Sequence, residues 1–191
     1  MKLLKTALAL VCILALQQLQ AQEDLRSSDL EITDSTATEY KPFSFNLKAK
    51  NMHLWKGLRV TDAPVLDVDL NYTSRDGKFK AGLWGGAGVT GYYTEFDYYV
   101  SYSTNGFSLS VWDINNYSDF PDAGIFDYDQ STTSHFIDVT LGYAFKPIPL
   151  KLSWSTIVQG RDTYLADNGE LKNAFSNYVE VSYGLIQKKD W

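Results

Sequence analysis

Residues 95–111 read EFDYYVSYSTNGFSLSV, an alternation of apolar and polar side chains interrupted once, at Asn105-Gly106. Alternation with a period of two is the signature of a strand with one apolar and one polar face. Asn-Gly between two such runs predicts a tight hairpin, because both residues tolerate positive φ. We therefore expect two antiparallel strands joined at Asn105-Gly106.

The same alternation recurs along most of the chain. Apolar and polar residues also alternate in six other segments, and no stretch of helical period follows residue 21. The eight segments expected as strands are 43–50, 66–72, 79–83, 95–102, 107–111, 137–145, 150–155 and 178–185. The sequence therefore predicts an all-β fold.

The connections between these segments alternate in length. Short turns are expected at 74–77, 105–106 and 146–149, and longer connections at 58–63, 89–93, 116–133 and 159–174. Short turns at one end and long loops at the other are typical of outer-membrane barrels. We expect an antiparallel up-and-down transmembrane β-barrel with eight strands in this chain. A soluble barrel would show the same alternation with its apolar face turned inward.

The start of the chain predicts export. Lys2 and Lys5 precede an apolar run from Thr6 to Leu16, too short to span a membrane as a helix, and Ala21 offers a cleavage site. We expect residues 1–21 to be a Sec-type signal peptide, 22–42 a disordered polar segment and 43–191 the barrel domain. The expected location is the outer membrane of a Gram-negative cell.

Composition limits the partners. The chain has 191 residues and a formal net charge of −6, which argues against nucleic acid as a partner. Its aromatic content is high, with 5 Trp, 13 Tyr and 10 Phe. Several of these lie near the ends of the expected strands, where membrane interfaces favour amphipathic rings, although ordinary cross-strand packing is the alternative. They are Trp55, Tyr72, Tyr92, Tyr93, Tyr102, Tyr117 and Tyr143. The expected partners are outer-membrane lipids.

A family resemblance rests on pieces found in order along residues 43–186. They include residues 51–57 (NMHLWKG), 81–85 (AGLWG), 126–129 (FDYD) and 177–183 (NYVEVSY). The chain resembles the TorF family of porin-like proteins, most closely its Bacteroidota-like branch. The resemblance implies an outer-membrane β-barrel and supplies no functional residue. Because relatives continue with further strands and alternation fails at Gln187 and Lys189, we expect a C-terminally truncated chain.

The polar strand faces carry the candidate functional residues. In a barrel of this kind these side chains meet in the lumen. The residues expected to line it are Lys48, Lys50, Asp67, Asp69, Lys80, Glu95, Asp97, Asp138, Lys151 and Glu180. Their charges can form a network that plugs an eight-stranded barrel, or can line a hydrated path in a wider one. Six acids against four bases would bias such a path toward cations.

We expect no catalytic, cofactor or metal site. Gly86–Gly91 spells G-x-G-x-x-G, but a strand follows it, whereas a dinucleotide site needs a helix. His53 and His135 lack flanking motifs, and His135 and Asp138 point to opposite strand faces. The acidic loop 119–129 lacks the ligand spacing of an EF-hand, leaving a solvated loop as the expectation and loose divalent-cation binding as the alternative.

Two functions remain open for such a barrel. The first is a porin-like passive channel for small solutes, which a larger number of strands would favour. The second is a non-conducting barrel that is structural or binds a ligand through its loops. An outer-membrane enzyme is a remote third, because no nucleophile, base and orienting group can be assigned together. The sequence specifies neither the solute nor the oligomeric state.

Overall fold

The computed structural model describes residues 40–184, and within them the fold is all-β. The expected signal peptide and nearly all of the expected disordered segment lie outside the described residues. Between Tyr40 and Gly184 no helix is long and apolar enough to cross a membrane.

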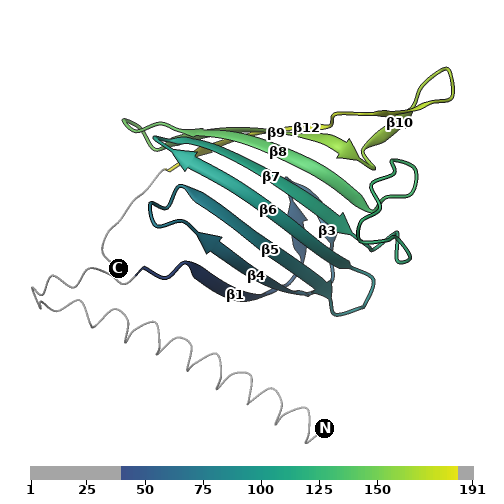
Figure 1. The fold of residues 1–191 in the computed structure, drawn as a ribbon, viewed down its shortest axis with the longest axis horizontal. Coiled ribbons are helices and arrows are strands. Elements are labelled where there is room, and N and C mark those ends of the chain that lie inside the picture. Colours follow the sequence, from purple (N-terminus) through teal and green to yellow (C-terminus); the bar gives the residue numbers. More distant parts are fainter. Residues whose placement is uncertain (1–39, 185–191) are drawn as a thin grey trace, which may run out of the picture. The chain divides into compact units, whose positions relative to one another are not determined.

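Eight strands form one antiparallel sheet in which every strand pairs with its neighbours in chain order (Figure 1). They are β1 (Phe43–Lys50), β4 (Val65–Thr73), β5 (Phe79–Gly88), β6 (Thr94–Thr104), β7 (Phe107–Asn116), β8 (His135–Ala144), β9 (Leu150–Gly160) and β12 (Asn177–Tyr183). Each corresponds to one expected strand, so the all-β, up-and-down, antiparallel prediction is confirmed.

Two small hairpins lie in segments for which the sequence analysis predicted no strand. The first pairs β2 (His53–Trp55) with β3 (Leu58–Thr61), and the second pairs β10 (Thr163–Leu165) with β11 (Leu171–Asn173). The first turns at Lys56-Gly57, with φ of 47° and 79°. The expected turn at Asn105-Gly106 has the same backbone form, with φ of 49° and 88°.

The expected alternation of connection lengths is present except at 89–93, which is as short as the turns at 74–78 and 145–149. Residues 74–78, 105–106 and 145–149 join strands through short turns at one end of the sheet. The connections at the opposite end include both hairpins and the long segment 117–134. Consecutive connections of an antiparallel meander fall at alternate ends, so the long connections share one end.

The sheet is open. Within residues 40–184, β1 pairs only with β4, and β12 pairs only with β9. The expected closure of the sheet into a barrel is therefore not observed. Because the number of strands is even, the two edge strands run antiparallel to each other, which is the orientation that closure requires.

The two faces of the sheet have an inverted distribution of exposure. In β4, Leu66 is 54% exposed, whereas the adjacent Asp67 is 1% exposed. Asp97 in β6 and Asp138 in β8 are each 3% exposed. Large apolar side chains on the other face are mostly exposed, from Phe43 and Phe45 in β1 to Val179 and Val181 in β12. In β4, β6 and β8 these polar-face residues are thus buried, whereas in the edge strands β1 and β12 nearly all residues of both faces are exposed.

Candidate functional site

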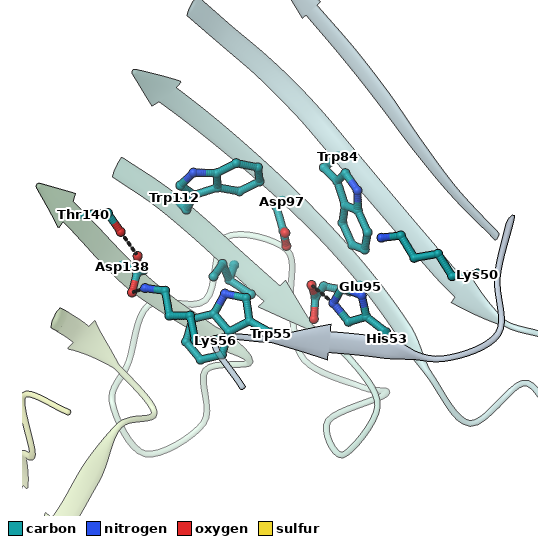
Figure 2. A pocket seen from close by; sticks show the side chains of 11 residues that line it. Lys50, His53, Trp55, Lys56, Trp84, Glu95, Asp97, Trp112, Asp138 and Thr140 are labelled. Carbon is teal, nitrogen blue, oxygen red and sulfur yellow. Dashed lines mark hydrogen bonds and ion pairs between the residues drawn. The ribbon is translucent and has the colours of Figure 1, made fainter. Parts of the chain in front are cut away.

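The β2–β3 hairpin covers part of the polar face, which we define as the face carrying Asp67, Asp97 and Asp138. Figure 2 shows the hairpin crossing the strands, with its side chains among those of the sheet. The His53 ring stacks against Trp84 of β5 and against Tyr93, with 5.4 Å between ring centroids in both cases. Trp55 contacts the ring of Phe136 edge-on.

Two ion pairs lie in this region, one within the sheet and one between the hairpin and the sheet. Lys50 at the end of β1 places its Nζ 2.7 Å from Asp67 Oδ2. Lys56, in the hairpin turn, pairs with Asp138 of β8, which also accepts a 2.9 Å hydrogen bond from the Thr140 hydroxyl. Buried carboxylates need such partners, because an unpaired charge is costly in a medium of low dielectric.

Two further carboxylates face the same region with polar but uncharged partners. Glu95 Oε2 accepts a 2.8 Å hydrogen bond from the Asn116 side-chain amide, and Asp97 Oδ1 accepts a 3.2 Å bond from the Asn115 backbone N–H. His53 Nε2 lies 4.0 Å from Glu95 Oε1. Within the described residues, neither carboxylate forms an ion pair with a lysine or arginine.

These side chains line a partly open cavity of about 210 Å³ between the hairpin and the sheet (Figure 2). It combines ionisable groups with the rings of three tryptophans and with Ile114. Its lining consists of Lys50, His53, Trp55, Lys56, Trp84, Glu95, Asp97, Trp112, Ile114, Asp138 and Thr140. An apolar pocket with a few convergent polar groups is the usual form of a small-molecule site.

Burial shifts the ionisation of groups around the hairpin. Burial, aided by the nearby Lys50 ammonium, lowers the pKa of the His53 imidazole below its usual value. Burial also lowers the pKa of Lys56, although the pairing with Asp138 opposes this shift. Tyr93 has its pKa raised by burial and by the neighbouring Glu95 carboxylate. His53 and Tyr93 are therefore held in their neutral forms.

The cavity contains four of the ten residues expected in a lumen: Lys50, Glu95, Asp97 and Asp138. Asp67 joins them through Lys50, and Asp69 accepts a 2.9 Å hydrogen bond from the Tyr99 hydroxyl nearby. The cavity does not include Lys48, Lys80, Lys151 or Glu180. The sequence analysis missed Trp84 and Trp112, and it considered Trp55 only as an aromatic residue near a strand end. Trp84 and Trp112 occupy positions of the alternation that polar residues hold elsewhere in their strands. A large ring at such a position is the sequence signal that could have identified them.

A second polar cluster lies on the opposite face, where the 117–134 connection meets the sheet. His135 is fully buried, and its Nδ1 lies 2.7 Å from Asp113 Oδ1. The Tyr128 hydroxyl donates to Asp113 Oδ2 at 2.6 Å. His135 and Asp138 thus serve different clusters on opposite faces, as expected. The sequence analysis did not anticipate the partner Asp113.

The glycine motif and the acidic loop considered in the sequence analysis have structural roles. Gly86 to Gly88 belong to β5, and Gly91 lies in the turn before β6, so no helix follows the glycines. In the acidic loop, Asp127 and Asp129 accept hydrogen bonds from neighbouring residues of the loop. Among the described residues, no group of three His, Cys, Asp or Glu side chains is arranged to hold a metal ion.

Comparisons of this chain with protein-family models, with curated proteins and with solved structures found no match.

Proposed function

We propose that this chain is an outer-membrane β-barrel protein whose polar face lines the barrel interior. The observation that carries the proposal is the inverted exposure of the sheet, with Leu66 outward and exposed and Asp67 inward and buried. Membrane barrels alternate apolar residues toward lipid with polar residues toward the lumen. The expected signal peptide and the alternating connection lengths support the same assignment.

Energetics favour lipid around the apolar face. In water, exposed apolar surface forfeits about 25 cal/mol per Å² relative to burial, while buried charges bear a desolvation cost. A soluble sheet with this pattern would incur the first penalty along all eight strands and the second at Asp67, Asp97 and Asp138. A bilayer removes the first, and the ion pairs of Asp67 with Lys50 and of Asp138 with Lys56 offset part of the second. Closure of the sheet would also pair the edge strands, since unpaired backbone groups are costly in hydrocarbon.

Of the two functions open to such a barrel, the geometry favours a non-conducting barrel that binds a small ligand. The β2–β3 hairpin lies across the polar face and is tied to it by Lys56 and Asp138. A path for solute along that face would meet this obstruction. The cavity beside the hairpin is of a size and composition suited to a ligand.

A porin-like channel is the second candidate. Lys80, Lys151 and Glu180 continue the polar face away from the hairpin. A barrel with additional strands would leave room for water beside these residues. Movement of the hairpin would then open the path.

One experiment distinguishes the ligand-binding barrel from the porin-like channel. The full chain is expressed in a Gram-negative bacterium, located by fractionation, tested for heat-modifiable gel mobility and then measured in a planar bilayer. We expect outer-membrane location, heat-modifiable mobility and little conductance, which rises when residues 52–62 are replaced by a Gly-Ser linker. A cytosolic location would overturn the membrane assignment. High conductance of the unaltered chain, unchanged by hairpin removal, would favour the channel.

A further inference from the structure

We propose that the cavity beneath the β2–β3 hairpin binds a small organic cation, an ammonium compound with an apolar body. This inference rests on the proposed function in that it names the ligand class of the same barrel. It is argued from the size of the cavity, its rings, its charge and its unpartnered polar atom.

The size and walls of the cavity suit a compact ligand with apolar surface. Its volume of about 210 Å³ exceeds the roughly 150 Å³ of an apolar cavity known to hold benzene. Trp55, Trp84 and Trp112 all contribute to its walls. Trp112 is held in place by stacking on Tyr99, with ring centroids 4.1 Å apart. Ordered indole rings provide both apolar contact and a negative ring face.

These tryptophans already contact ammonium groups within the chain. Lys56 Nζ lies 4.8 Å from the centre of the Trp55 ring, and Lys50 Nζ lies 5.6 Å from that of Trp84. Both distances are in the range of cation–π attraction, which is also how aromatic cages recognise quaternary ammonium ligands. The cavity is therefore built from the side chains that attract this class of cation.

Two acidic side chains of the lining have no lysine or arginine partner among the described residues. Lys50 and Lys56 are engaged by Asp67 and Asp138, so their charges are compensated. Glu95 and Asp97 have amide partners, and in the described part of the chain neither pairs with a lysine or arginine. A bound ammonium ion would be attracted to these two carboxyl groups and would favour their ionised forms, because low dielectric strengthens the attraction.

An unpartnered polar atom at the same place points independently to a ligand. His53 is 8% exposed, and its Nδ1 has no hydrogen-bond partner among the described residues. Buried polar atoms are almost always satisfied in folded proteins. A hydroxyl or ammonium group of a ligand in the cavity could satisfy it. An inorganic metal ion fits less well, because the described residues offer no group of three metal-ligating side chains.

The test compares choline with its neutral isostere 3,3-dimethylbutan-1-ol, using tryptophan fluorescence and calorimetry on the full chain in detergent. We expect choline to bind at least about tenfold more tightly than the isostere, because the isostere lacks the charge. Asp97→Asn should weaken choline binding by about tenfold, and Glu95→Gln serves as a second variant should the first not fold. Glu180→Gln, on the polar face but outside the cavity, is the matched control and should bind as the unaltered chain does.

Equal affinity for choline and the isostere would overturn the proposal, as would undiminished choline binding by a folded Asp97→Asn or Glu95→Gln variant. Tighter binding of glucose than of choline would also overturn it and assign the cavity to neutral sugars. Heat-modifiable mobility is measured on the same preparation. A barrel that fails to bind choline overturns only this inference, whereas a choline-binding protein without heat-modifiable mobility overturns only the membrane assignment.

Discussion

Val100 illustrates the exposure of apolar side chains on one face of the sheet. Val100 of β6 is 45% exposed, although it lies in the middle of its strand and pairs with Val111 and Ala81. Three apolar side chains in adjacent strands therefore share one face. In water such a row of exposed apolar side chains would favour association with other protein surfaces, whereas in a bilayer it would contact acyl chains.

Lysine at position 100 tests which solvent this face meets. Val100→Lys should lower the free energy of unfolding by roughly 2–4 kcal/mol near the bilayer midplane. Ser110→Lys, on the polar face of the adjacent strand, should lower it by less than about 1 kcal/mol. Urea unfolding of the protein reconstituted in lipid vesicles provides both values. Equal losses at the two positions would indicate that Val100 does not face lipid.

His53 should make stability depend on pH. Its pKa is lowered from about 6.5 by burial and by Lys50, so the unfolded chain binds a proton more readily than the folded chain. The destabilisation therefore appears as pH falls below about 6.5, and stability recovers as pH rises above it. Asp67 opposes the lowering of this pKa only in part, and the other neighbouring acid is Glu95, whose Oε1 lies 4.0 Å from His53 Nε2.

The measurement is the free energy of unfolding at about pH 7.5 and about pH 5.5, for the unaltered chain and for His53→Gln. We expect the loss of stability at the lower pH to be smaller in the variant. The difference between the two proteins isolates His53, because Glu95, Asp67 and His135 are present in both. An identical pH dependence would show that His53 is protonated equally in the folded and unfolded states.

At the scale of elements, the docking of the β2–β3 hairpin depends on one buried ion pair. Lys56→Met leaves the Asp138 carboxylate, with a side chain 4% exposed, without its cation. We expect a loss of about 3 kcal/mol in the free energy of unfolding, most of it recovered in the double variant Lys56→Met/Asp138→Asn. Denaturant titration of the single and double variants measures the coupling.

Lys172→Met is the matched control for this cycle. Lys172 pairs with Glu170 at 3.9 Å in the second hairpin, where both side chains are exposed. Removing an exposed pair should cost less than about 1 kcal/mol. Similar losses at Lys56 and Lys172 would mean that the first hairpin is not held to the sheet by its ion pair.

The sequence predicts the eight long strands because their alternation extends over five or more residues. Four features made this possible: the period of two, the Asn-Gly turn, the absence of helical period and the alternation of connection lengths. The strands β2 and β10 have only three residues each, too few for alternation to be recognised. The first hairpin was therefore not predicted, and only its second strand falls within an expected longer connection, 58–63.

The candidate site was predictable only in part, for a related reason. Glu95, Asp97 and Asp138 can be assigned to one face from the sequence, because successive side chains of a strand point to alternate faces of the sheet. It does not reveal that a distant connection folds back over them. The pairing of Lys56 with Asp138 joins residues 82 positions apart, which no local pattern encodes. His53 and the three tryptophans become neighbours only through that folding back.

At the scale of the whole molecule, the open sheet and the proposed membrane environment make conflicting demands. The outer edges of β1 and β12 leave backbone groups without partners within the described residues. In hydrocarbon each such group costs several kcal/mol, so a spanning sheet must close. Closure can occur between β1 and β12 of one chain or between edges of two copies, since exposed edges also pair between molecules.

Cysteine cross-linking distinguishes these arrangements. Position 12 holds the single cysteine of the chain, so Cys12→Ser provides a cysteine-free background. Leu47→Cys in β1 is combined in turn with a cysteine at Val179, Val181 or Tyr183 in β12, all on the exposed face. Because only one register brings Cβ atoms within about 4.5 Å of each other, we expect one combination to form a disulfide rapidly on oxidation. An intramolecular cross-link identifies a single-chain barrel, whereas a cross-linked dimer identifies closure between two copies. The absence of any cross-link in membranes would contradict pairing between these two edges.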